Sequence, residues 1–268
     1  MGHELDEVID RLFPKQIGRG ASKCRQDPLA SDIPANFARD SCPIQAASSS
    51  YVQAVDTNQL MEIATEGNLL IWLQHRPGDF VVKGSPLALV YPAESVRKNL
   101  AEKIKDVFVL GSQRTALQDV EFLIAQLVEI AARALSPGIN DPFTAIRCID
   151  QLSAALCHLA EKEIPSAYRY DDEDKLRVIA ESVTFVDATD VAFNQIRQYG
   201  QTSVGVTMRL LKAIAAIAPF THTKSNRAAL LRHANMIERG SHEGISEELD
   251  RNGVKERYLA AVKAIEQR

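Results

Sequence analysis

The sequence predicts an α+β fold that is predominantly α, a helical bundle that carries a small β module. Apolar residues recur at helical spacing through most of the chain after Glu94, whereas strand-like runs between Gly and Pro turns concentrate in residues 51–91. Apolar residues make up 46% and charged residues 25% of the 268 residues, as in globular proteins with a packed core. We expect an N-terminal helix and loosely ordered arm over residues 1–50, the β module over 51–110 and the helical domain over 111–268.

The chain opens with an amphipathic helix over residues 4–13, whose apolar positions fall on one stripe and end before a proline. Residues 18–50 are rich in Gly, Pro and Ser without periodicity, which predicts weak order. The start lacks the apolar run of a signal peptide, and the most apolar stretch, residues 204–220, is interrupted by Arg209 and Lys212. We expect the chain as given to be soluble.

The β module is predicted from short β-branched and aromatic runs between turn residues. Its expected strands are residues 51–55, 69–74, 80–82 and 87–91, with an edge strand over 107–110 and a short helix over 58–66 ended by Gly67. The Gly-Asp and Lys-Gly turns of residues 76–90 resemble one half of the barrel-sandwich hybrid of lipoyl and biotinyl carriers. No lysine stands in a carrier-type Met-Lys-Met hairpin, so we expect the shape without the carrier role.

The remaining elements are predicted to be helical. Their expected ranges are residues 94–105, 116–135, 142–162, 173–182, 188–200, 203–218, 224–239 and 246–266. The acidic run of residues 171–174 fits a helix start, where carboxylates favour the positive end of the dipole. Thr115 with Gln118 fits a capping box at the head of the second helix in this series.

Two of these helices meet at residues 134–145, Ala-Leu-Ser-Pro-Gly-Ile-Asn-Asp-Pro-Phe-Thr-Ala. Gly138 suits a left-handed helix exit, Asp141 suits the N-cap of the next helix and Pro142 suits its first position. Helix punctuation alone therefore accounts for this motif, and a functional interpretation needs a further observation.

That observation is a polar stripe on the preceding helix, where 14 of the 20 residues from Ala116 to Leu135 are apolar. Asp119, Gln126 and Arg133 recur every seven residues on this expected buried helix and run toward the turn. Glu129 precedes Arg133 by four residues, the favourable order for an ion pair. Buried charges are costly unless they are paired or bind something, so both a structural ion-pair network and a ligand site are open.

Two ligand classes fit these residues. An anion of phosphate or nucleotide type could be held by arginines near the helix N-terminus, although Asp141 there would repel it. The arginines are Arg114, Arg133, Arg147 and Arg197. A divalent cation could be held by the oxygens of Asp119, Asn140 and Asp141, although no dense acidic loop supports this.

Other classes of function are disfavoured by the sequence. A formal charge of -4 provides no field for nucleic acid, and no nucleophile elbow, P-loop or dinucleotide glycine motif occurs. The six histidines are scattered, and the four cysteines have no zinc or Cys-x-x-Cys spacing. We therefore expect no cofactor, no metal site and no enzymatic activity, in a reducing, cytoplasmic setting.

Three strings carry a family resemblance: Arg-Thr-Ala-Leu-Gln-Asp at 114–119, the turn motif at 134–145 and Ala-Phe-Asn-Gln-Ile-Arg-Gln-Tyr-Gly at 192–200. Together they resemble the C-terminal soluble region of a bacterial predicted membrane protein family of unknown function, the domain of unknown function 2254. The resemblance implies that membrane helices precede this region and that it lies on the cytoplasmic side. Matching positions make its motif residues candidate ligand-binding residues: Arg114, Asp119, Arg133, Ser136, Asn140, Asp141 and Arg197.

The sequence thus predicts a non-enzymatic sensing, regulatory or assembly domain of a bacterial membrane protein. Its expected partners are the membrane-embedded helices of the same full-length protein, with a small anionic ligand and a homo-oligomer as further options. The alternative is a hydrolase or phosphate-handling enzyme with its site around residues 114–145.

Overall fold

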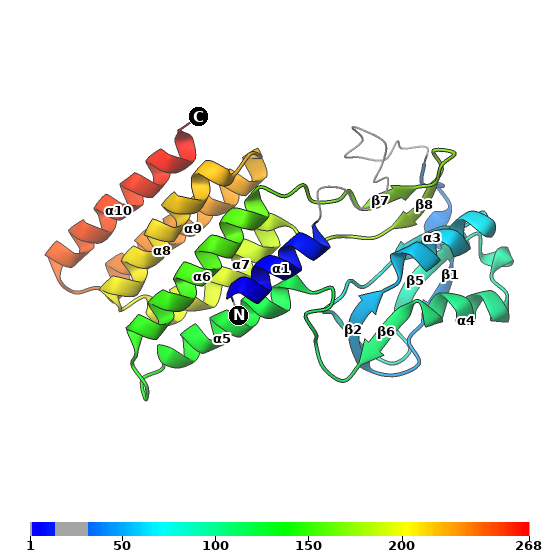
Figure 1. Cartoon of the computed structure of the whole chain (residues 1–268), viewed down its shortest axis with the longest axis horizontal. Helices are drawn as coiled ribbons and strands as arrows, with labels where there is room; N and C mark the ends of the chain where they lie inside the picture. Colours follow the sequence, from blue (N-terminus) through cyan, green and yellow to red (C-terminus); the bar gives the residue numbers. More distant parts are fainter. Residues whose placement is uncertain (1, 14–31, 268) are drawn as a thin grey trace. The chain divides into compact units, whose positions relative to one another are not determined.

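The computed structural model describes residues 2–13 and 32–267, which fall into two compact units. The helical unit comprises Met1–Leu12, Val120–Glu163 and Val183–Arg268, and the sheet unit comprises Phe13–Asp119 and Ile164–Ser182. Figure 1 labels the elements of both. Part of the arm expected over residues 18–50 lies outside the described residues. The expectation of weak order was wrong for the described part, which forms α2 (Phe37–Asp40) and β1 (Cys42–Gln45).

The strands of the sheet unit are β1 (Cys42–Gln45), β2 (Ser50–Val55), β3 (Leu70–Leu73), β4 (Phe80–Val81), β5 (Pro86–Tyr91), β6 (Phe108–Gly111), β7 (Tyr168–Tyr170) and β8 (Leu176–Ile179). A five-stranded sheet has the order β1-β5-β3-β8-β7, in which only β3 and β8 are parallel. A three-stranded antiparallel sheet has the order β4-β2-β6, which confirms the predicted edge strand. The described strands close no barrel, so the barrel-sandwich arrangement stays a prediction.

One apolar core joins the two sheets to α3 (Thr57–Glu66) and α4 (Lys98–Asp106). Val52, Ile71 and Val90 are fully buried in it, because alternate strand residues point to one face, and Ile104 of α4 is buried against them. The opposite face of the larger sheet packs on α2 (Phe37–Asp40), where an aromatic cluster forms between Phe37, Trp72 and Tyr91. The short helix expected over 58–66 is confirmed as α3, whereas the expected helix over 94–105 is a turn of η1 (Ala93–Ser95) followed by α4.

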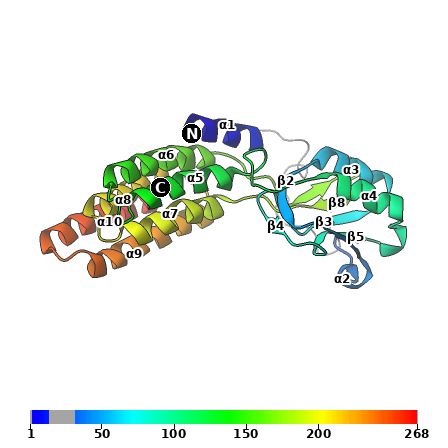
Figure 2. The ribbon, with the colours of Figure 1, turned by 90° about the horizontal axis from the view of Figure 1, so that it is seen from below.

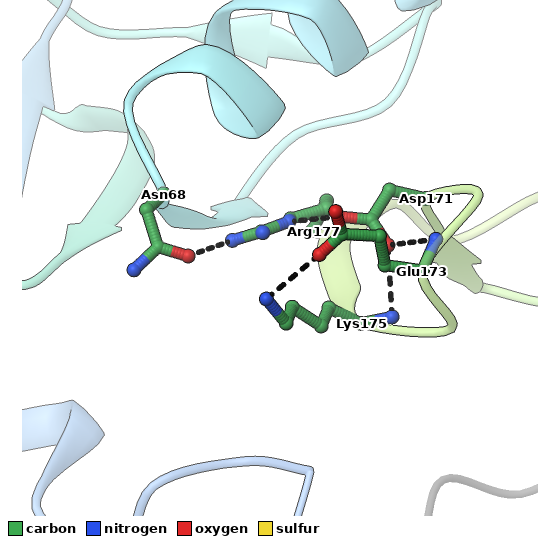
Figure 3. Close-up of polar contacts among 5 residues, drawn as sticks. All are labelled: Asn68, Asp171, Glu173, Lys175 and Arg177. Carbon is green, nitrogen blue, oxygen red and sulfur yellow. Dashed lines mark hydrogen bonds and ion pairs between the residues drawn. The ribbon is translucent and has the colours of Figure 1, made fainter.

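The helix predicted over residues 173–182 was wrong, because this segment forms the β7–β8 hairpin. Asp171 organises the turn: its carboxylate accepts the backbone N–H groups of Glu173 and Lys175, both at 2.9 Å, and Arg177 Nε at 2.6 Å (Figure 3). Arg177 also donates to Asn68 Oδ1 at 2.7 Å, which ties the hairpin to the loop between α3 and β3. The acidic run is therefore a turn fixed by a buried ion pair and not a helix start.

The helical unit contains α1 (Gly2–Leu12), α5 (Val120–Ala134), α6 (Pro142–Ala160), α7 (Phe185–Gly200), α8 (Val204–Ile217), η2 (Ala218–Phe220), α9 (Lys224–Gly244) and α10 (Glu248–Glu266). The long helices lie side by side in this unit (Figures 1 and 2). α8 packs against α6 and α10 and buries Ala213 in the core of the bundle, whereas Ala216 is exposed. The predicted opening helix is confirmed as α1, which contacts α5 and α6.

Side-chain caps fix where several of these helices begin. Asp141 caps α6, Thr223 caps α9, and Thr184 with Asp187 forms a complete capping box at α7. The box expected from Thr115 and Gln118 was wrong. The Gln118 side chain instead exchanges two hydrogen bonds with the backbone of Val55, and α5 begins only at Val120.

Candidate functional site

The candidate site is an open groove of about 450 Å³ in the helical unit, formed by α5, α6 and the turn between them. Its lining residues are Gln126, Glu129, Ile130, Arg133, Ala134, Ile139, Asp141 and Thr144. The groove therefore includes Arg133 and Asp141 of the predicted site residues, together with Gln126 of the predicted stripe. Ile130 and Ile139 contribute exposed apolar surface, 38% and 57% accessible.

The turn beside the groove is closed by its own hydrogen bonds. Ser136 Oγ donates to the Arg133 carbonyl at 2.7 Å, and the Asp141 N–H donates to the Ala134 carbonyl at 2.8 Å. Asn140 adopts the left-handed conformation, with φ of 47°, which asparagine tolerates better than most residues. The expectation that Gly138 would take this conformation was wrong. Ser136 and Asn140 thus have structural roles in shaping the turn.

Asp141 is engaged at the start of α6, as the sequence predicted. Its carboxylate accepts the Thr144 hydroxyl at 2.5 Å and the Thr144 N–H at 3.1 Å. These hydrogen bonds, led by that of the hydroxyl, hold the pKa of Asp141 below its ordinary value. A carboxylate that stays ionised at this helix N-terminus repels an incoming anion.

The predicted ion pair between Glu129 and Arg133 is confirmed, with Glu129 Oε1 and Arg133 Nη2 at 2.5 Å. The predicted burial of the stripe was wrong at Arg133, whose side chain is 72% exposed, as is its partner Glu129 at 65%, whereas Asp119 is buried and Gln126 is partly buried. α5 buries the opposite residues, such as Leu127 and Ala131, and leaves Glu129 and Arg133 on its outer face.

Asp119 and Arg114 form a separate, partly buried ion pair in the sheet unit. Asp119 is only 1% exposed, and its two oxygens accept Arg114 Nε at 2.8 Å and Nη2 at 3.0 Å. Gly78 lies directly against this carboxylate, at a φ of +99°. The pair lies in the connection between β6 and α5, where Asp119 directly precedes α5, and it packs against the β3–β4 turn.

The predicted residues therefore divide between the two units. Arg114 and Asp119 belong to the sheet unit, and Arg133, Ser136, Asn140, Asp141 and Arg197 belong to the helical unit. The divalent-cation alternative loses its basis, since Asp119 is committed to Arg114 and Asp141 to Thr144. Within the described residues, no group of three or more His, Cys, Asp or Glu side chains is placed to hold a metal ion.

Arg197 on α7 lies in a polar cluster that sequence reasoning missed. Within the described part of the chain, its Nε is buried without a hydrogen-bond partner. Nearby, His233 on α9 is fully buried and its Nε2 lies 2.6 Å from Asp190 Oδ1, on α7. Because a carboxylate only accepts, Nε2 carries the proton. Burial chiefly lowers the pKa of His233, and Asp190 opposes this shift.

The signal for this cluster was present in the sequence. His233 occupies the same helical stripe as Leu230, Ala234 and Ile237, all of which are buried. A polar residue within such a stripe indicates a buried polar partner, because unpaired burial is costly. The partner Asp190 could not be identified, since nothing in the sequence alone sets which face of α7 meets α9.

Comparisons with known proteins agree with the family resemblance. The family model described as "Predicted membrane protein (DUF2254)" matches residues 1–216. Two uncharacterised proteins, one from Mycobacterium bovis and one from Mycobacterium tuberculosis strain H37Rv, are each 27% identical to it over 270 residues. The match covers 98% of this chain and 52% of each relative, so the chain spans about half of their length.

Two further findings frame this result. No solved structure matches the chain significantly. Among the helices that the structure describes, none combines the length and apolar character needed to cross a bilayer. On the strength of the family match, which covers most of its length, the chain belongs to the family of predicted membrane proteins that carries the domain of unknown function 2254.

Proposed function

We propose that this chain is a non-enzymatic assembly module of a bacterial membrane protein, on the cytoplasmic side of the membrane. In this proposal the groove beside the α5–α6 turn receives a segment of the membrane-embedded part of the same full-length protein. One observation carries the proposal: apolar side chains of the groove, Ile130 and Ile139, face outward while its carboxylates are engaged locally.

The chemistry of the lining supports docking over catalysis. A general acid or base must exchange a proton with its substrate, and this requires a group that is free to titrate. Asp141 is occupied by both donors of Thr144, and its pKa lies below the ordinary range. Glu129 holds Arg133 in an exposed ion pair. These commitments disfavour the alternative of a hydrolase or phosphate-handling enzyme at this site.

The size and polarity of the groove fit a protein segment. An amphipathic helix binds such a groove by placing apolar side chains at spacings of three and four residues. Ile130, Ala134 and Ile139 provide the apolar contact, and Gln126 and Thr144 offer hydrogen bonds that would set the register of the partner. A groove of about 450 Å³ holds only a few side chains, so the segment would be anchored by one or two large residues.

The test is retention of this module by the membrane half of the full-length protein. A protease site is introduced between the two halves, the protein is cleaved in detergent, and the fraction of this module that co-purifies with the membrane half is measured. Ile130→Asp places a charge in the groove and is expected to reduce the affinity of the module for the membrane half at least tenfold, so that less of it co-purifies. Leu259→Asp, at an exposed apolar position of α10 outside the groove, is the control and is expected to be retained.

Equal retention of the Ile130→Asp and Leu259→Asp variants would contradict the proposal. The ligand alternative has its own signature: inorganic phosphate or a nucleotide would raise the melting temperature of this chain by mass action, and Arg133→Met would abolish that rise. Such a result would show that the groove binds a small ligand and would contradict its role in assembly.

A further inference from the structure

A second feature of the helical unit is the position of its most exposed apolar side chains. Leu249, Phe143 and Ile139 are 77%, 74% and 57% exposed, more than any other large apolar side chain described in this unit. Tyr199 is also 55% exposed. They come from the α5–α6 turn, the first turns of α6 and α10 and the last turn of α7. We call these four side chains the tip residues.

The tip residues gather at one end of the bundle. The Cβ direction of Gly200, at the end of α7, points to the Leu135 side chain just after α5, at 3.5 Å. Gly244, at the end of α9, lies against the backbone of Gln201. The α5–α6, α7–α8 and α9–α10 connections therefore share one end of the helical unit, as both ribbon views show (Figures 1 and 2).

This arrangement suits a flat partner. Side chains at the ends of neighbouring helices form a layer roughly perpendicular to the helix axes. A peptide or a small ligand is instead bound in a groove or a pocket. Exposed large apolar side chains that gather on one surface mark an interaction site. Tyr is enriched at the interface between the hydrocarbon and the headgroups of a bilayer, and Phe and Leu occur on the lipid-facing side of interfacial helices.

The charges at this end indicate which kind of lipid surface fits. The carboxylates there, of Glu129, Asp141, Glu243, Glu247, Glu248 and Asp250, outnumber the guanidinium groups of Arg133, Arg147 and Arg251. No positive excess is available to attract anionic headgroups, so attraction must come from apolar contact. The expected partner is therefore a zwitterionic bilayer interface.

We propose that the tip residues dock this end of the helical unit onto the membrane surface, by inserting apolar side chains at the level of the lipid headgroups. Membership of a membrane protein family supports this, because it places the chain beside a bilayer. The contact is interfacial and does not span the bilayer. Ile139 belongs both to the groove of the proposed function and to the tip residues, whereas Phe143 and Leu249 do not line the groove. The experiment therefore uses Phe143 and Leu249 to separate the two.

The test is flotation of this chain with phosphatidylcholine vesicles, with and without an added anionic phospholipid. The wild-type chain is expected to float with phosphatidylcholine alone, and neither salt nor anionic lipid should strengthen its partitioning. Phe143→Ser and Leu249→Ser are each expected to weaken partitioning by about tenfold, since each removes one inserted apolar side chain. Leu259→Ser is the matched control, because Leu259 lies on the same helix as Leu249, about 15 Å from it along the axis.

Four outcomes would overturn this proposal: no flotation of the wild-type chain, equal loss in the Leu259→Ser variant, flotation that requires the anionic lipid, or a self-association of the chain that the tip variants abolish. The last outcome would assign the surface to a second copy. Ile130→Asp, which alters the groove, should float like the wild type. Full retention of the Ile130→Asp module together with intact flotation would therefore count against the proposed function alone.

Discussion

Asp119 places an ionisable carboxylate inside the protein, since its side chain is only 1% exposed. Removing a charge from water costs several kcal/mol unless hydrogen bonds replace the hydration. Arg114 supplies two of these bonds in a bidentate geometry. Gly78 makes the arrangement possible, since any side chain at this position would occupy the space of the carboxylate.

Gly78→Ala should therefore destabilise the sheet unit strongly. A Cβ at this position collides with the Asp119 carboxylate, and the backbone has a φ of +99°, which is strained for alanine. We expect a loss of about 3 kcal/mol or more in the free energy of unfolding, measured by urea denaturation.

Gly84→Ala is the matched control for this prediction. Gly84 also has a positive φ, of +87°, but nothing lies within 4 Å of the position of an added Cβ. Only backbone strain of about 1 kcal/mol is expected there. If the two variants lost equal stability, the packing of Gly78 against Asp119 would not have the importance that we give it.

At the scale of elements, α7 and α9 are joined by a polar contact inside an apolar interface. Asp190 on α7 accepts from His233 at 2.6 Å and from Arg232 at 2.5 Å, and Phe193 packs edge-on against the His233 ring. His233 Nδ1 is buried without a hydrogen-bond partner in the described part of the chain. Protonating that nitrogen would place a cation near Arg197 and Arg232.

This contact predicts a pH dependence of stability. Burial lowers the pKa of His233 in the folded chain, so on acidification the unfolded chain binds a proton before the folded chain does. Stability is then complete above the ordinary histidine pKa, near 6.5, and is lost as the pH falls below it. In thermal denaturation between pH 7 and pH 5, His233→Gln should flatten this decline.

His242→Gln provides the comparison, because His242 lies on the same helix but is 57% exposed and pairs with Glu238. It should leave the decline unchanged. A decline that is the same in the wild type and in His233→Gln would show that His233 is not the group responsible.

Elements with a regular apolar period were predictable, and the exceptions have local causes. α1, α6, α8 and the strands β2 to β6 follow their periodicity closely. The β7–β8 segment was misassigned because its sequence, Tyr-Arg-Tyr followed by four acidic residues, is compatible with a helix start. Its pairing with β3, a strand about a hundred residues earlier, depends on a tertiary contact that the local sequence does not encode.

At the scale of the whole molecule, sequence spacing could not predict how the candidate site residues divide between the two units. The seven-residue repeat from Asp119 to Arg133 assumed one continuous helix, but α5 begins at Val120 and the two ends of the repeat belong to different units. The caps, the Glu129–Arg133 pair and the turn were predictable, because they depend on neighbours in sequence. Burial and the groove were not, since they depend on the packing of α6 and α7 on α5.

Because Arg133 is exposed, a stability measurement on an Arg133 variant is a weak test of the assembly hypothesis. An exposed ion pair contributes at most about 1 kcal/mol, so removal of Arg133 would not distinguish a scaffold from a ligand site by stability alone. A direct probe of what occupies the groove is needed.

That probe is photo-crosslinking in membranes that contain the full-length protein, with benzoylphenylalanine placed at Ile130 or, for comparison, at Leu259. We expect a crosslink from position 130 to a membrane-embedded segment of the same full-length protein, and none from position 259. The absence of such a crosslink at position 130, or an equal yield at both positions, would contradict it.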